Sequence, residues 1–264
     1  MLRSVFGKSL WDQRRGIIGW SVAVAAVGVL YAGFYPSMNN PDMEAAIRAF
    51  PEGLLEALGM TDITSPAGYL GSTTYGILGP VIMVIFGGSL GVRAVAGDED
   101  AGLLDVLLAH PVSRWTVVVQ RAAAMVVAVG VAGAFLFVAM VIASGPAQFA
   151  ELGIGNLAAA TGHLVLLSLV FGALGLAAGA LTGSRAIAWG VVASVAAATY
   201  LANTLAPTVD AIGWAQNLSP WFYYSGGRPL AEGFQAGDAA VLAVTALVLV
   251  GVAVLGLSRR DVAV

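Results

Sequence analysis

Long runs of hydrophobic residues alternate with short polar segments along the whole chain. Six of these runs reach about twenty residues, the helical length that crosses roughly 30 Å of hydrocarbon. We therefore predict an all-α integral membrane protein with a single transmembrane domain over residues 1–264. The membrane-spanning helices are expected near residues 16–35, 72–92, 116–143, 157–181, 187–207 and 239–257. Pro80 is expected to kink the second span.

The composition agrees with this pattern. Of the 264 residues, 59% are hydrophobic and only 10% are charged, and the mean hydropathy is +0.87. A soluble domain carries roughly 25% charged residues, so the excess apolar surface must face lipid. The chain has no cysteine, which excludes disulfides and thiolate metal sites, and we expect no bound metal.

The positive charges indicate the orientation, because cytoplasmic loops are enriched in lysine and arginine. If both ends of the chain are cytoplasmic, ten of the twelve cations lie at cytoplasmic ends or loops, and only Arg48 and Arg228 lie outside. The inverted topology would reverse that ratio. The prediction is therefore an N-in/C-in topology.

Residues 1–15 precede the first span and place apolar and charged side chains at helix-like spacing. This pattern favours an N-terminal interfacial helix, with its apolar side among the headgroups and its cations toward anionic membrane lipids. An ordinary flank of the first span is the alternative.

Two segments on the expected outer side are more than connections. Residues 41–60 carry apolar and acidic residues on opposite helical faces, which predicts an amphipathic segment on the outer surface. Residues 208–238 contain a set of aromatic residues together with Pro220 and the Gly226–Gly227 pair. This outer loop is either re-entrant or an aromatic belt at the interface, and the sequence leaves both open.

The expected spans contain few polar residues. No Asp or Glu lies inside any of them, and His163 and Asn203 are the candidate polar residues of a transport pathway. A lone histidine in an apolar helix is more often a packing residue than a proton relay, whereas ion-coupled transporters need buried ionisable groups. The energy for any uphill transport is therefore expected to come from another polypeptide.

Glycines recur at a spacing of four residues in two of the expected spans. The pairs are Gly87 with Gly91 and Gly175 with Gly179. Such pairs let helices approach closely, and we expect them to pack within the bundle rather than between subunits.

Two motifs that resemble those of enzymes do not fit their chemistry. Gly7-Lys8-Ser9 resembles the end of a phosphate-binding loop, but Leu2 stands where that motif needs its first glycine. The run 87–91 fits a nucleophile elbow around Ser89, but Ser89 lies inside an expected helix and His163 lies toward the opposite face of the membrane. An intramembrane serine protease is thus the less favoured alternative, and no catalytic residue is expected.

The expected cytoplasmic loop between the second and third spans has an amphipathic pattern. Asp98, Glu99 and Asp100 precede leucines at 103, 104, 107 and 108, and Pro111 follows. Acids in a first turn complement the helix dipole, the leucines form one stripe, and the proline ends the run. This predicts a short cytoplasmic helix over residues 98–110, with Arg114 and Arg121 as snorkelling anchors.

Two motifs carry a resemblance to a known family. The cytoplasmic loop reads Gly102-Leu103-Leu104-Asp105-Val106-Leu107-Leu108-Ala109-His110-Pro111-Val112-Ser113-Arg114, and the last outer loop contains Leu218-Ser219-Pro220-Trp221. These runs resemble motifs of the type 2 permeases of ATP-binding-cassette (ABC) exporters. That family often has Thr or Ser where Leu103 stands. The six spans and the N-terminal helix extend the resemblance over nearly the whole chain.

The resemblance implies that the loop helix is a coupling helix that docks on a separate ABC ATPase. Two permease chains, identical or not, and two ATPase chains would form the working unit, in the cell (plasma) membrane of a bacterium. ATP and Mg²⁺ would bind the ATPase, so this chain is expected to carry no cofactor, and no nucleic acid is expected as a partner. The implied ATPase-coupling residues are Asp98, Glu99, Asp100, Gly102, Leu103, Leu104, Asp105, Leu107, Leu108, Pro111 and Arg114.

The physical pattern agrees with this implication, because an amphipathic helix at the inner surface needs a protein surface to cover its apolar stripe. Walls of small and apolar residues with few charges favour a hydrophobic or amphipathic cargo. The alternative is a channel, or a structural or regulatory membrane protein, that never meets an ATPase.

Overall fold

The computed structural model describes residues 4–40, 64–100, 102, 113–206 and 210–260. Within these ranges six helices are long and apolar enough to cross a membrane, and no strand is present. The predicted all-α membrane fold is therefore confirmed. The amphipathic segment predicted over residues 41–60 lies outside the described residues. The six helices are α1 (Val5–Met38), the helical stretch Pro66–Asp100, α8 (Arg114–Ser144), α9 (Ile154–Thr182), α10 (Arg185–Leu205) and α13 (Ala236–Arg259).

The second span and the last outer loop are each built from several short helices. The second span contains α4 (Pro66–Ser72), η1 (Thr74–Leu78), α5 (Gly79–Val92), η2 (Arg93–Gly97) and α6 (Asp98–Asp100). The last outer loop contains η4 (Asp210–Leu218), α11 (Pro220–Ser225) and α12 (Pro229–Glu232), and η3 (Ala150–Leu152) joins α8 to α9.

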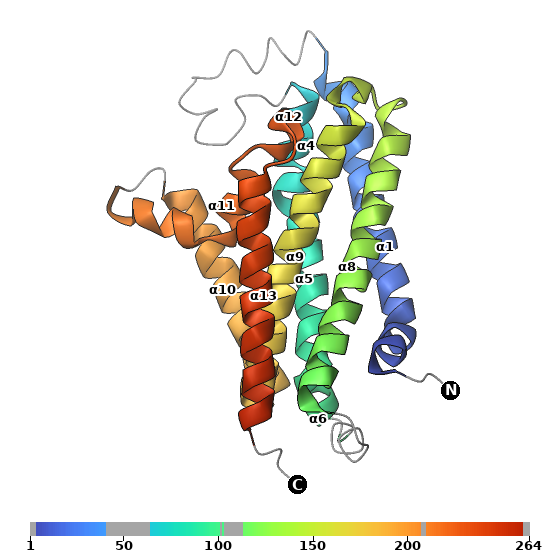
Figure 1. The fold of residues 1–264 in the computed structure, drawn as a ribbon. Coiled ribbons are helices and arrows are strands. Elements are labelled where there is room, and N and C mark those ends of the chain that lie inside the picture. The colour runs from blue at the N-terminus through green and yellow to red at the C-terminus, as the bar shows by residue number, and fades with distance from the viewer. Residues whose placement is uncertain (1–3, 41–63, 101, 103–112, 207–209, 261–264) are drawn as a thin grey trace.

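Helix α9 lies at the centre of the bundle, and α5, α8, α10 and α13 pack around it (Figure 1). Glycines make the closest of these approaches possible. A Cβ atom on Gly91 would lie 1.9 Å from the carbonyl oxygen of Gly172, and one on Gly87 would lie 2.3 Å from that of Ser168. The Ser168 hydroxyl also donates to the Met83 carbonyl at 2.6 Å. The prediction that Gly87 and Gly91 pack within the bundle is confirmed.

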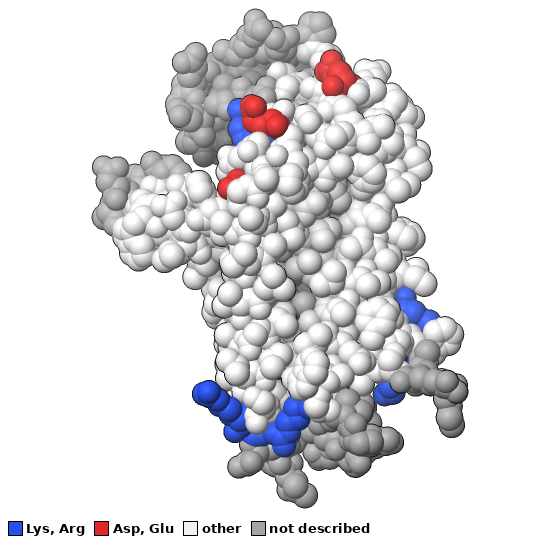
Figure 2. Space-filling view, viewed as in Figure 1, with Lys and Arg blue, Asp and Glu red and all other residues white. Residues whose placement is uncertain are grey.

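The start of α1, the end of α13 and α6 lie at one end of the bundle (Figure 1). Figure 2 shows lysine and arginine side chains gathered at this end, and acidic side chains near the other. We call the first of these the basic end. Among the described cations, Arg228 alone lies at the opposite end, at the start of α12. The positive-inside rule predicts that the basic end faces the cytoplasm, and the N-in/C-in topology stays a prediction.

Helix α1 is continuous over 34 residues, with Ser4 as its N-cap. At 1.5 Å per residue it is about 51 Å long, which exceeds the roughly 30 Å of hydrocarbon. Its first turns are held against α8 by a hydrogen bond from the Phe6 amide to the Gln120 side-chain oxygen, at 3.0 Å. The predicted interfacial helix is therefore the first part of α1 rather than a separate element, and its position at the headgroups stays a prediction.

Candidate functional site

The second span is the most irregular of the six. Two π-helical segments interrupt it, η1 before Pro80 and η2 after Val92. Proline cannot donate a backbone hydrogen bond, and the turn before it widens in response. A π-helical segment is thus present one turn before Pro80, and the kink predicted at Pro80 stays a prediction. π-Helical turns inside α-helices often mark functional positions, because the backbone there adjusts at low cost.

An apolar groove of about 380 Å³ lies between the second span and α10. This volume falls within the range typical of small-molecule sites. Trp221 lines one part of the groove, where its ring meets that of Tyr200 edge-on at 5.2 Å. Charged residues are absent from the groove wall formed by the described residues. The wall consists of Gly76, Ile77, Val81, Val84, Ile85, Trp189, Val192, Ala193, Ala196, Ala197, Tyr200 and Trp221.

The motif Leu218-Ser219-Pro220-Trp221 fixes α11 against this groove. The Ser219 hydroxyl donates to the Thr199 carbonyl of α10 at 2.8 Å and accepts from the Trp221 amide at the start of α11, at 3.2 Å. Trp221 is 6% exposed and packs on Phe171 of α9, whereas Leu218 is exposed. The motif therefore positions a buried tryptophan between α9 and α10.

Tyr224 ties the same short helix to the second span. Its hydroxyl donates to the Tyr75 carbonyl of η1 at 2.5 Å. Burial raises the pKa of the Tyr224 phenol well above its ordinary value, so the hydroxyl stays a hydrogen-bond donor. The outer loop thus folds back into the bundle at α11, while η4 projects away from it (Figure 1).

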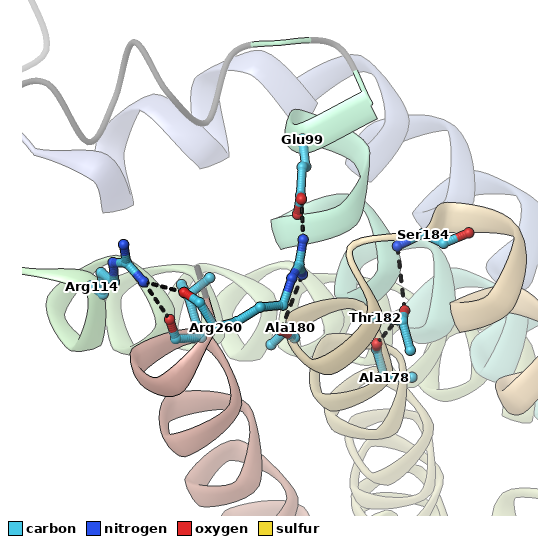
Figure 3. A network of polar contacts seen from close by, with 8 residues as sticks. Glu99, Arg114, Ala178, Ala180, Thr182, Ser184 and Arg260 are labelled. Carbon is cyan, nitrogen blue, oxygen red and sulfur yellow. Dashed lines mark hydrogen bonds and ion pairs between the residues drawn. The ribbon is translucent and has the colours of Figure 1, made fainter. Parts of the chain in front are cut away.

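At the basic end, two ion pairs join the end of the second span to other helices. Asp98 pairs with Arg121 of α8, and Glu99 pairs with Arg260, which follows α13. Figure 3 shows Arg260 reaching from Glu99 to the Ala180 carbonyl near the end of α9, the latter at 3.3 Å. We call the two pairs the acid clamp, because together they connect α6 with α8, α9 and α13.

Arg114 adds a further connection beside the acid clamp. Its guanidinium donates to the Leu257 carbonyl at the end of α13, at 3.1 Å, and also to the Arg260 carbonyl (Figure 3). The residue that begins the third span therefore also holds the end of the sixth. A cation near the last carbonyls of a helix is favoured by the helix dipole.

Asp98 to Asp100 continue the helical stretch Pro66–Asp100. The cytoplasmic helix predicted over residues 98–110 stays a prediction, because most of that range lies outside the described residues. Gly102 follows with a φ of +65°, and its amide bonds to the Glu99 carbonyl at 2.9 Å, as at a helix C-terminus. Acids there oppose the helix dipole, and the two arginines compensate them. Residues 103–112, with the remaining expected coupling residues, lie outside the described part of the chain.

Arg121 also differs from its predicted role. We expected it to snorkel toward the headgroups, but it is 7% exposed and points to Asp98 inside the bundle. The pairing of Asp98 with Arg121 and of Glu99 with Arg260 could not be predicted, because these residues are 23 and 161 positions apart in the sequence. From the sequence one could infer only that cations lie on the same side of the membrane as Asp98 and Glu99.

The remaining candidate residues, His163, Asn203 and Ser89, form no common site. His163 is fully buried, with Nδ1 at 2.9 Å from the Ala159 carbonyl and its ring 5.2 Å from that of Phe234. Asn203 is half-buried, and its side-chain oxygen has no hydrogen-bond partner. The Ser89 hydroxyl donates to the Phe86 carbonyl of its own helix at 2.7 Å, so Ser89 and His163 form no nucleophile–base pair.

Comparison with protein families agrees with these features. The model of the family described as "ABC-2 family transporter protein" matches residues 3–262. The chain belongs to this family. It is therefore a multi-pass membrane component of an ABC transporter, and ABC-2 permeases work with an ABC ATPase subunit rather than hydrolysing ATP themselves. No curated protein matches the chain.

Proposed function

We propose that this ABC-2 permease is the membrane-spanning subunit of an ATP-driven exporter for hydrophobic or amphipathic cargo. The apolar groove between the second span and α10 forms part of the wall of the translocation pathway. Residues 103–112 dock on a separate ABC ATPase, and the working complex contains two ATPase chains and two permease chains. Its location is the cell membrane of a bacterium.

One observation carries the proposal: a single helical stretch runs from the apolar groove to the expected ATPase-binding loop. The stretch Pro66–Asp100 lines the apolar groove with residues between Gly76 and Ile85, and the motif that resembles type 2 permeases begins at Gly102, two residues beyond Asp100. A displacement of residues 103–112 by the ATPase is therefore transmitted along this stretch to the groove wall. The π segments η1 and η2 supply the places where this stretch can change shape.

The acid clamp couples this displacement to other helices. Because Asp98 and Glu99 are bonded to α8 and to the residue after α13, movement of α6 also moves the third and sixth spans. Close glycine packing between α5 and α9 passes the same movement to the bundle centre. The interior of a packed bundle is not freely compressible, so such shifts are transmitted rather than absorbed.

The groove chemistry supports the cargo class. Its walls are alkyl and aromatic, so an apolar molecule gains burial there while a charged one loses hydration. A cargo of about 380 Å³ or an apolar portion of a larger molecule fits the space.

Reconstituted vesicles provide the test. The complex of the chain with its co-purified ATPase is exposed to a panel of hydrophobic and amphipathic compounds, and ATP hydrolysis is measured. We expect stimulation by at least one compound. Ala193→Trp, which fills the groove, should abolish that stimulation, whereas Ala198→Trp, an exposed alanine of α10 outside the groove, should leave it intact.

Two results would count against the proposal. Equal stimulation in both variants would remove the groove from the pathway. Flux of the same compounds through vesicles without ATP would favour a channel instead.

A further inference from the structure

A second cavity, of about 190 Å³, lies at the basic end of the bundle. The first turns of α1, the end of the second span and α8 enclose it. Its polar lining includes three cations and two acids, and its apolar lining comes from side chains of the same three helices.

The charges around this cavity do not balance. Lys8 is paired with Asp12 at 3.6 Å, and Arg121 is paired with Asp98. Arg93 is exposed and forms no ion pair with any of the described residues. Among the described residues that line the cavity, one positive charge is therefore left over, which a single negative charge in the cavity would neutralise.

Arg121 supplies a second and independent indication of an anion. The side chain is 7% exposed, and its Nε and Nη1 atoms have no hydrogen-bond partner although both are buried. A buried guanidinium with unused donors is costly. Arginine also matches the geometry of phosphate oxygens particularly well. A phosphate group in the cavity would supply the missing acceptors.

The apolar part of the lining decides between a soluble anion and a lipid. Leu10, Leu90 and Met125 form this part, and they would contact the glycerol and first methylenes below a phosphate. Exposed Trp11 and Trp115 lie at the same end, as expected for residues at headgroup depth. We propose that the cavity binds the phosphate group of an anionic membrane lipid in the leaflet at the basic end.

The test measures lipid binding to the full chain in neutral detergent by native mass spectrometry. Phosphatidylglycerol and phosphatidylcholine, which differ in net charge, are titrated separately. We expect the chain to bind phosphatidylglycerol more tightly. Lys8→Gln combined with Arg93→Gln should weaken that binding by about tenfold or more, since the two changes remove charged donors to the phosphate oxygens. Both residues are exposed, so the fold should tolerate the changes.

Arg185→Gln is the matched control, because Arg185 is an exposed cation that begins α10 and does not line the cavity. It should leave phosphatidylglycerol binding unchanged. The proposal is overturned if the double variant binds phosphatidylglycerol as tightly as the unmodified chain, or if the control loses as much affinity. Displacement of the lipid by millimolar inorganic phosphate, without discrimination between the two lipids, would assign the cavity to a soluble anion instead. None of these outcomes depends on the ATPase or on the cargo.

Discussion

The two partners of the buried ion pair in the acid clamp should respond very differently to substitution. Arg121 is 7% exposed, whereas the Asp98 side chain is 35% exposed. Asp98→Asn leaves a guanidinium buried without its counter-charge. Arg121→Met replaces the guanidinium by an apolar side chain of similar length and leaves a carboxylate that water can reach. Because Arg121 is the more buried partner, Asp98→Asn should destabilise the protein more than Arg121→Met.

The magnitudes follow from the same burial. Removing one partner of a buried pair costs roughly 3–5 kcal/mol, and the partial exposure of Asp98 places Asp98→Asn near the lower limit, at about 3 kcal/mol. Arg121→Met should cost about 1 kcal/mol, the net value of a typical hydrogen bond. The double variant should also lie near 1 kcal/mol, because apolar replacement of a whole buried pair is often close to neutral.

The assay is the free energy of unfolding, measured by denaturant titration in neutral detergent without anionic lipid. Anionic lipid is left out so that no phosphate compensates Arg121 in the Asp98→Asn variant. The reasoning is refuted if Arg121→Met costs as much as Asp98→Asn, or if the double variant is less stable than Asp98→Asn alone.

Two further predictions concern the packing and the outer motif. Gly91→Ala should destabilise the bundle by about 3 kcal/mol, because its Cβ would overlap the Gly172 carbonyl oxygen; Gly190→Ala, where nothing lies within 4 Å, should be neutral or stabilising by up to about 1 kcal/mol. Thermal unfolding of the two variants compares them directly, and equal effects would contradict the packing argument. Ser219→Ala should cost about 2 kcal/mol in the same assay, because it removes both the N-cap of α11 and the bond to Thr199, and an unchanged midpoint would show that the motif does not anchor α11.

Much of the fold could be predicted from the sequence because the bilayer imposes strong constraints. The length and apolarity of the runs locate the six helices, and the distribution of cations predicts which side of the membrane each helix end faces. The tight contact at Gly91 was also predictable, since a glycine pair spaced by four residues presents one smooth helix face. Each of these features depends on local sequence.

The parts that could not be predicted depend on contacts between distant residues. The acidic triplet at 98–100 fits the first turn of a separate helix as well as a turn of the second span, and only the fold shows that α6 continues the second span. The pairing of Glu99 with Arg260 requires knowing that α13 ends beside α6. The groove could not be predicted either, because it forms between the second span and α10, which are far apart in sequence. The π segment that shapes one of its walls has no simple sequence signature.

The most direct test of the central claim is the affinity of the partner ATPase for the chain. The ABC ATPase that co-purifies with the unmodified protein is titrated against the Leu104→Asp, Leu107→Asp double variant, with Leu218→Asp at the exposed outer motif as the control. Placing two carboxylates in the expected apolar stripe should weaken binding by at least about a hundredfold, at roughly 1.4 kcal/mol per factor of ten. The control should bind like the unmodified chain. Undiminished binding of the double variant would contradict the assignment of residues 103–112 as the ATPase contact.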